Sequence, residues 1–244
     1  MCAGILLGAQ LAKADEIQPG KTNRWESVAS VGLTLTRGNS RNFLATGSLN
    51  STRKWAHDEF LFGSSAGYGE ATVHSGGTET SSKTDAYLRG FGQWNHLFSE
   101  RLYGGVRLTG EHDDIADLAY RFTLSPLVGY YFIKQTNTFL SGELGPSVVN
   151  EKKGGDEKTY AGLRVGERYE YKFTLGAKLW ETLEWIPQID DFDNWILNVE
   201  AGVSAPITKS LDVRLLAQDT YNNRPASGRL KNDFKLIAGI GYKF

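Results

Sequence analysis

The chain has 244 residues and a mass of 27.0 kDa, and its 27 basic and 28 acidic residues give a formal net charge of −1. This balance argues against nucleic acid as a partner, because phosphate binding needs a basic stripe and none is visible. The single cysteine, Cys2, excludes a disulfide framework, a cysteine-ligated metal site and a cysteine nucleophile.

The first 14 residues have the features of a secretory signal peptide. The stretch from Cys2 to Ala12 is almost wholly apolar and small, and Ala12-Lys13-Ala14 matches an A-x-A cleavage signal. No Lys or Arg precedes the apolar stretch, and a short core helix is the alternative. We expect residues 1–14 to be a signal peptide, complete or truncated at its start, and residues 15–24 to be a short periplasmic segment. After residue 14, no apolar run approaches the ~18 residues of a transmembrane helix.

From Trp25 to the end of the chain, apolar and polar residues alternate with a period of two, which is typical of β-strands. The clearest run is the last, where every second residue from Phe234 to Phe244 is apolar. About twelve such runs are present. They start near Trp25, Ser40, Asp58, Ser82, Arg101, Ala119, Asn137, Lys158, Lys178, Asn194, Ser210 and Lys231.

The predicted connections alternate between short and longer ones, as the two ends of an outer-membrane barrel do. The short ones are 54–57, 96–100, 134–137, 174–177 and 208–210; the longer, polar ones are 71–80, 113–118, 151–157 and 222–230. Residues 38–40 and 190–193 break this alternation, because they are short. Pro126, Pro146 and Pro187 lie inside predicted strands, where proline cannot donate to the ladder, so we expect either bulges or different strand limits there.

The polar face of these runs is charged, which favours a membrane barrel over a soluble one. The charges that we expect to line the lumen are Arg89, Arg107, Glu111, Arg121, Glu143, Arg164, Arg168, Glu170, Glu184, Glu200, Asp212, Arg214 and Lys235. The other face is aromatic near the strand ends and small or aliphatic between them, as in a lipid-facing belt. Since lipid offers no hydrogen bonds to the backbone, a spanning sheet must close on itself.

The predicted fold is therefore all-β: a transmembrane antiparallel up-and-down β-barrel of about twelve strands over residues 25–244. An even number of strands places both termini on one side, which we expect to be the periplasm. The expected location is the outer membrane of a Gram-negative bacterium. A soluble periplasmic β-barrel that binds an apolar ligand is the alternative.

Four segments carry a resemblance to a known family: VGLTLTRGNS at 31–40, RLYGGVRLTGEHD at 101–113, YRFTL at 120–124 and LSGELGP at 140–146. They resemble the salt-induced outer-membrane proteins, a domain family of unknown function, and the resemblance covers nearly the whole chain after residue 14. It implies an outer-membrane barrel and supplies no catalytic residues.

The last strand is similar to the signal that the barrel-assembly machinery reads. Gly239, Tyr242 and Phe244 stand at the glycine and the two apolar places of that signal, whereas Ile237 departs from its preference for a polar residue. The expected partners are this machinery, outer-membrane lipid and lipopolysaccharide. The sequence does not indicate an oligomeric state.

Two functions fit a charged lumen. Salt bridges can plug and stiffen the barrel, or the charges can line a narrow pore for small solutes or ions. Twelve strands lie between the eight that side chains fill and the sixteen of open porins, so size does not decide between these functions.

Catalysis and metal binding have weaker support. Glu111, His112, Asp113 and Asp114 form a weak candidate for a divalent cation, and a solvated acidic loop is the plainer interpretation. An outer-membrane hydrolase is a remote alternative, because no serine stands in a recognisable nucleophile context. We expect neither enzyme activity nor a cofactor.

Overall fold

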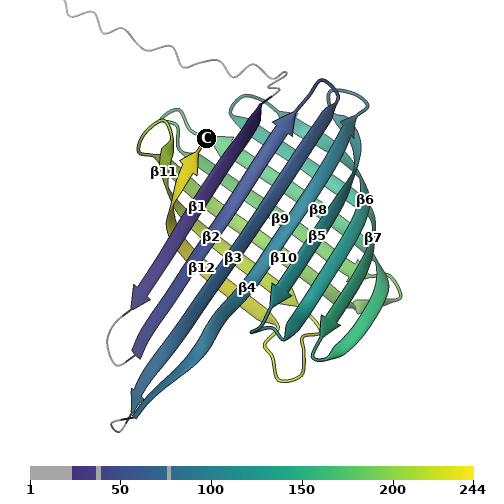
Figure 1. The fold of residues 1–244 in the computed structure, drawn as a ribbon. Coiled ribbons are helices and arrows are strands. Elements are labelled where there is room, and N and C mark those ends of the chain that lie inside the picture. The colour runs from purple at the N-terminus through teal and green to yellow at the C-terminus, as the bar shows by residue number, and fades with distance from the viewer. Residues whose placement is uncertain (1–23, 37–39, 76–77) are drawn as a thin grey trace, which may run out of the picture.

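The computed structural model describes residues 24–36, 40–75 and 78–244, and these residues form one closed β-barrel (Figure 1). Each strand pairs antiparallel with the next, and β12 returns to pair with β1. The strands are β1 (Trp25–Thr36), β2 (Ser40–Lys54), β3 (Asp58–Ser75), β4 (Thr78–Leu97), β5 (Leu102–Asp113), β6 (Leu118–Lys134), β7 (Thr138–Lys153), β8 (Asp156–Lys172), β9 (Lys178–Gln188), β10 (Asp191–Pro206), β11 (Leu211–Asn222) and β12 (Asn232–Lys243). In this part of the chain, no helix is long and apolar enough to cross a membrane. The predicted fold, a closed antiparallel barrel of twelve strands, is confirmed. The expected signal peptide lies outside the described residues.

The barrel closes where the first and last strands meet. Gly32 on β1 pairs with Gly239 on β12, and the backbones of Ser27 and Phe244 exchange two hydrogen bonds of 3.0 and 3.1 Å. A side chain at position 239 would collide with the carbonyl group of Val31, so glycine permits the close approach of the two strands. The ladder from Val28–Lys243 to Gly32–Gly239 closes the sheet on itself, as a sheet that spans lipid must.

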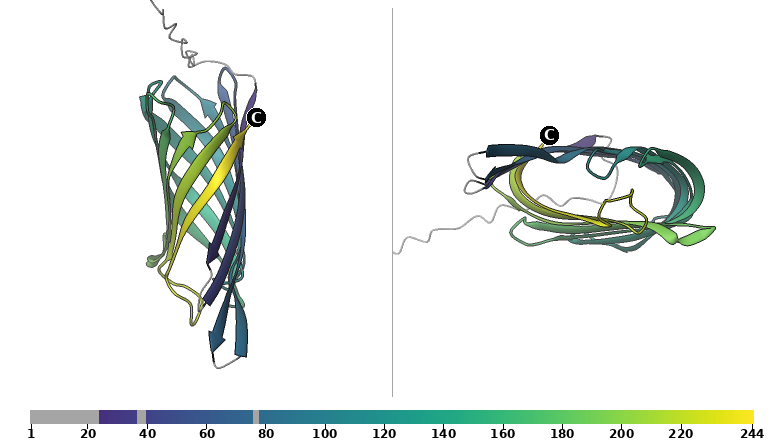
Figure 2. Two further views of the ribbon diagram at one scale, coloured as in Figure 1. Left: turned by 90° about the vertical axis from the view of Figure 1, so that its left-hand side faces the viewer. Right: turned by 90° about the horizontal axis from the view of Figure 1, so that it is seen from below.

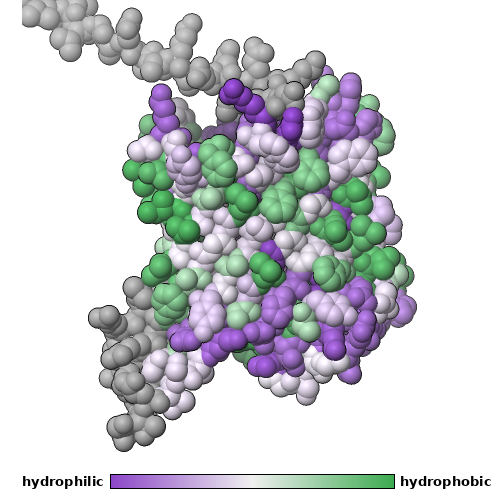
Figure 3. Space-filling model, viewed as in Figure 1, coloured by the Kyte–Doolittle hydropathy of each residue, from purple (hydrophilic) through white to green (hydrophobic). Residues whose placement is uncertain are grey.

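The two faces of the wall are inverted relative to a soluble protein. Outward-facing Leu144 and Ile240 are about half exposed, whereas inward-facing Arg121 and Asp212 are buried. Figure 3 shows apolar and neutral residues over the middle of the barrel wall and hydrophilic residues nearer its two ends. A barrel that holds an apolar ligand would need an apolar interior, so the soluble alternative does not fit the charged interior of this barrel.

The expected difference in loop length is mostly wrong. β3 continues to Ser75 and β4 starts at Thr78, while two residues, Gly154 and Gly155, connect β7 to β8. Both glycines have positive φ (60° and 87°), which favours glycine in a tight hairpin turn. The polar residues before them continue the ladder, as in the pair Lys153–Asp156, because ladder pairing does not require apolar side chains. In the described part of the chain, the long connection is 223–231, between β11 and β12.

The three prolines lie inside strands. Leu124 pairs with Val148 and Val128 with Leu144 in one unbroken register, so Pro126 stands opposite Pro146 and no bulge is needed. Each proline lacks an N–H, and the ladder skips the rows between these pairs. The expected bulge is absent at these two positions. Pro187, in contrast, pairs with Trp195 beside a register shift.

The barrel is flattened into an oval cross-section (Figure 2). Side chains on opposite long walls can therefore meet across the interior. We name the two ends by their contents: the terminal end holds Trp25 and Phe244, and the distal end holds the connection 223–231.

Candidate functional site in the lumen

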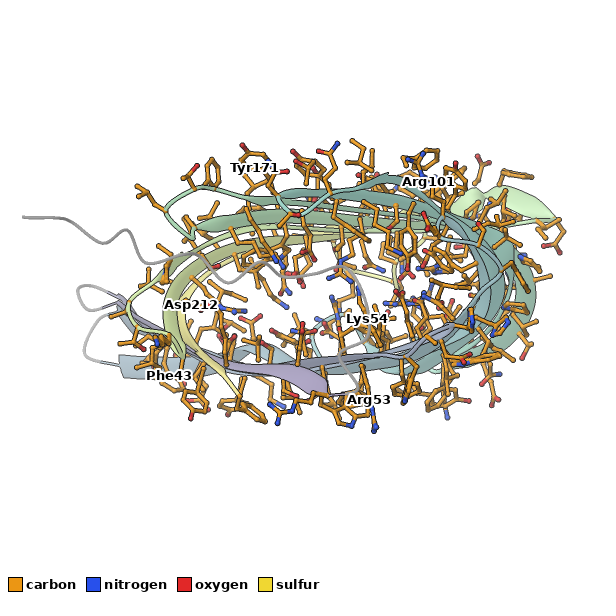
Figure 4. The ribbon with its side chains drawn as sticks, turned by 90° about the horizontal axis from the view of Figure 1, so that it is seen from above. Phe43, Arg53, Lys54, Arg101, Tyr171 and Asp212 are labelled. Carbon is orange, nitrogen blue, oxygen red and sulfur yellow. The ribbon has the colours of Figure 1, made fainter. Side chains whose placement is uncertain are left out.

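Every second residue of each strand faces the lumen, and cross-strand partners share a face. By this register the predicted lumenal charges point inward: Arg89, Arg107, Glu111, Arg121, Glu143, Arg164, Arg168, Glu170, Glu184, Glu200, Asp212, Arg214 and Lys235. Figure 4, viewed from the terminal end, shows Asp212 and Lys54 directed into the lumen and Phe43 and Arg53 directed outward.

A neutral cluster of two arginines and two glutamates occupies the middle of the lumen. Arg164 on β8 donates to Glu143 at 2.8 Å and to Glu184 at 2.6 Å. Arg107 on β5 lies 3.5 Å from Glu184 on β9, across the barrel. Gln93 on β4 donates to Glu143 at 2.6 Å. These contacts tie β4, β5, β7, β8 and β9 together through side chains alone.

A second cluster lies closer to the distal end. Arg121 on β6 donates to Glu151 at 2.7 Å and to Glu111 at 3.2 Å, and Lys153 lies 3.1 Å from Glu151. Arg121 and Glu151 are buried. Burying charges is tolerated here because each has a partner of opposite sign.

Two tyrosines extend the filled region toward the terminal end. The rings of Tyr103 and Tyr131 lie 4.7 Å apart. Tyr103 donates to Glu143 at 2.9 Å, and Tyr131 donates to Glu59 on β3. The inward-facing residues of β6, from Arg121 beside the distal cluster to Tyr131 in this ring pair, are all buried.

The other half of the lumen is lined differently. The middles of β1, β2 and β3 present small inward residues without charge: Ser30, Gly32, Ser48, Asn50, Gly63, Ser65 and Gly67. Asn50 is exposed and Ser48 is half-buried, although both face the interior. Solvent therefore reaches this part of the lumen, whereas it does not reach the inward face of β6.

Glycines on this side and on β10 make room for large rings that lie along the wall. A side chain at position 67 would collide with the ring of Tyr87, and one at position 202 would collide with the indole of Trp180. The Trp180 indole donates to Glu200 at 2.9 Å. Rings that lie over glycines narrow the lumen less than rings that project into it.

The distal connection 223–231 contacts strands far from its own hairpin. Lys153 of β7 donates to the carbonyl oxygen of Arg224 at 2.7 Å, and Arg224 lies 2.5 Å from Asp191. Ala226 is buried beside Gly154. The connection reaches over part of the lumen in the view from below (Figure 2), and a cavity of about 50 Å³ lies beneath it, lined by residues that include Arg89 and Asp233.

The candidate cation ligands do not converge. Glu111 accepts from Arg121, and Asp113 accepts the backbone N–H groups of Ile115 and Ala116 at 3.0 Å. His112 faces away from them and contacts Asp114 at 3.0 Å. No group of three or more His, Cys, Asp or Glu that could hold a metal ion is found among the described residues.

Asp114 already has a cationic partner. The ammonium of Lys83 donates to it at 2.8 Å and lowers the pKa of this carboxyl below its usual range.

Several inward charges near the strand ends escaped the sequence reasoning. They are Glu26, Lys54, Glu59, Asp85, Asp113, Glu151, Lys158, Lys172, Lys178, Asp233 and Lys243. Extending the phase of each run to its last residue would have found most of them. Lys54, Asp113 and Glu151 lie in the segments expected to be connections, 54–57, 113–118 and 151–157, so the phase was not carried to them.

A closed barrel of antiparallel strands with an apolar outer surface and a charged interior is the architecture of outer-membrane β-barrels. Solved structures with this fold resemble the chain. The NanC porin matches with a TM-score of 0.54 and 8% identity, over 90% of this chain and 100% of that one. The COG4313 outer membrane channel from Pseudomonas putida F1 matches with a TM-score of 0.52 and 10% identity, over 96% of this chain and 100% of that one. At these identities the likeness shows the fold.

No curated protein matches the chain. The family model described as "Protein of unknown function, DUF481" matches residues 29–244, so the chain belongs to the DUF481 family. The resemblance inferred from the sequence is thus confirmed as a family of unknown function with an outer-membrane barrel fold. The salt-induced designation stays a prediction.

Proposed function

We propose that this protein is an integral outer-membrane barrel with a narrow passage for small hydrophilic solutes or ions. The passage runs along the half of the lumen that β1, β2, β3 and β12 line. One observation carries the proposal: inward-facing Asn50 is exposed, whereas the inward residues of β6 are buried from Arg121 to Tyr131. The paired charges of β5 to β9 fill and stiffen the other half. The protein has no catalytic role in this proposal.

The proposed orientation in the membrane follows from the even number of strands, which places both termini on one side. Both termini and the connections 55–57, 98–101, 135–137, 173–177 and 207–210 lie in the periplasm, and the connection 223–231 faces outward from the cell. Tyr242 and Phe244 lie on the lipid side, stacked with centroids 5.9 Å apart, and Gly239 faces the lumen. This arrangement presents the two aromatic groups of the assembly signal to membrane or to the assembly machinery.

Single-channel recording in a planar bilayer tests the passage. We expect small, steady currents from the purified barrel. Ser48→Trp, which places an indole in the passage, should reduce the conductance at least two-fold. Leu49→Trp, on the lipid side of the same strand, should leave it unchanged. A silent barrel would support the structural alternative, in which the cross-lumen contacts close the lumen completely.

Membrane insertion is tested separately. We expect the protein in the outer-membrane fraction, extracted only by detergent and with heat-dependent mobility on a denaturing gel. Recovery in the osmotic-shock supernatant would contradict the proposal.

A further inference from the structure

The ion pairs at the terminal end are asymmetric in their exposure. Lys54 is 46% exposed and its partner Glu59 is 7% exposed; Lys243 is 44% exposed and its partner Asp212 is fully buried. Arg168 is 40% exposed against 14% for Glu170. In each pair the carboxylate is covered and the cation faces the solvent in the lumen.

Inward-facing cations gather at the terminal opening of the barrel, where the passage begins. They come from five strands and point inward: Lys54, Arg168, Lys172, Lys178, Arg214 and Lys243. The inward acids at the same end are Glu26, Glu59, Glu170 and Asp212. Of these four side chains, that of Glu26 is exposed and the other three are buried or half-buried. Deeper in the lumen, Glu200 accepts hydrogen bonds from Trp180 and Gln218.

A near-neutral set of charges can still present one sign to a solute. A charge that faces water lies closer to a passing ion than its covered partner does, so the ion meets the sign of the exposed charge more strongly. A narrow mouth with low-dielectric walls concentrates the resulting field. From this geometry we propose that the passage selects small anions, such as chloride and short carboxylates, over cations. This inference rests on the proposed passage and names the class of solute it takes.

The reversal potential across a planar bilayer with a tenfold KCl gradient measures this selectivity. The anion-to-cation permeability ratio is expected to exceed one. Lys172→Glu should lower it roughly three-fold, because it changes the charge at the terminal end of the lumen by two units and a charge acts over about one Debye length, ~8 Å at physiological salt. Lys172 is exposed and is not the ion-pair partner of Glu59, Glu170 or Asp212, so this substitution spares the buried pairs.

Two further variants sharpen the test. Glu26→Gln should raise the ratio, because it removes the exposed acid. Lys209→Glu makes the same change of charge at the same end, in the connection 207–210 outside the lumen, and should leave the ratio unchanged. Currents that select cations, or that ignore Lys172→Glu and Glu26→Gln, would overturn the anion inference and leave the passage in place.

A readout without current separates the two proposals. Single cysteines are introduced into a Cys2→Ala chain, Asn50→Cys inside the lumen and Thr208→Cys outside it. For each cysteine, the rate of reaction with an anionic thiol reagent is divided by the rate with a cationic reagent of equal size. This ratio should be higher for Asn50→Cys than for Thr208→Cys. If the barrel conducts no current, the proposed passage is rejected. Equal rate ratios at the two cysteines would then also reject the cationic mouth. A rate preference for the anionic reagent in a silent barrel would retain an anion-attracting vestibule.

Discussion

Arg107 and Glu184 face each other across the flattened barrel, with Nε of the arginine 3.5 Å from Oε1 of the glutamate. Three strands, β6, β7 and β8, separate β5 from β9 along the wall, so this contact crosses the lumen. The guanidinium of Arg107 also lies 3.9 Å from the centroid of Phe91. Side chains therefore hold one half of the lumen together, whereas solvent reaches inward-facing Asn50 in the other half.

Arg164 is expected to be the most sensitive charged position for stability. Its side chain is 5% exposed and donates to both Glu143 and Glu184. Arg164→Met leaves two carboxylates short of a buried partner, which should cost about 3–5 kcal/mol of unfolding free energy. Urea unfolding of the barrel in detergent or lipid, followed by tryptophan fluorescence, measures this loss. Arg168→Met is the control: its side chain is 40% exposed and should cost about 1 kcal/mol or less. Equal losses for both variants would contradict the assignment of the filled half.

Gly129 is expected to be intolerant of even one added methyl group. A side chain there would collide with the ring of Tyr103, whose hydroxyl donates to Glu143. Gly129→Ala should therefore destabilise the barrel by about 1–3 kcal/mol. Gly92→Ala meets no atom within 4 Å and should be neutral within about 0.5 kcal/mol. The difference in urea midpoint between the two variants checks the prediction, and a neutral Gly129→Ala would refute the tight packing of Tyr103.

The connection 223–231 is expected to restrict the distal opening. It is attached to the opposite wall by Lys153 and to Asp191 by Arg224. Deleting residues 225–229 should raise the single-channel conductance, because the polar cover over the cavity beneath it is lost. Arg224→Ala alone should change stability by less than about 1 kcal/mol, since the Arg224 side chain is 53% exposed. An unchanged conductance after the deletion would show that the narrowest point lies elsewhere.

Asp114 offers a pH-dependent prediction at a connection outside the barrel wall. Its pKa is lowered, chiefly by the hydrogen bond from Lys83. Because the pKa of Asp114 is lower in the folded state, the Lys83–Asp114 contact stabilises the fold at pH values above the ordinary carboxyl pKa of about 3.9. This stabilisation is lost as the pH falls below that value. Carboxyl NMR titration in micelles should place the pKa of Asp114 below about 3.9, and Lys83→Met should raise it toward that value. An identical titration in both proteins would disprove the coupling.

Much of the wall was predictable from the sequence. The runs near Trp25, Ser40, Asp58 and Lys178 begin where β1, β2, β3 and β9 begin. Alternation is a strong signal here because lipid on one side and charge on the other impose opposite chemistry on successive residues. The limits failed at 71–80 and 151–157, where polar residues occupy successive positions and the alternation fades although the ladder continues.

The lumen was less predictable than the wall. The pattern places Arg107 and Glu184 on the inward face without pairing them, because they lie on strands far apart in the sequence. The burial of the Asp212 side chain and the exposure of the Lys243 side chain likewise depend on the angle and length of the neighbouring strands.

The sequence alone determined that the chain forms a closed membrane-type barrel, since the period of two and the chemistry of each face are local properties. The tertiary structure decided which half of the lumen is filled and which sign of charge faces the solvent. Those outcomes depend on the oval cross-section, which brings distant strands within hydrogen-bonding distance on one side, and on the small inward residues of the neighbouring strands β1, β2 and β3 on the other.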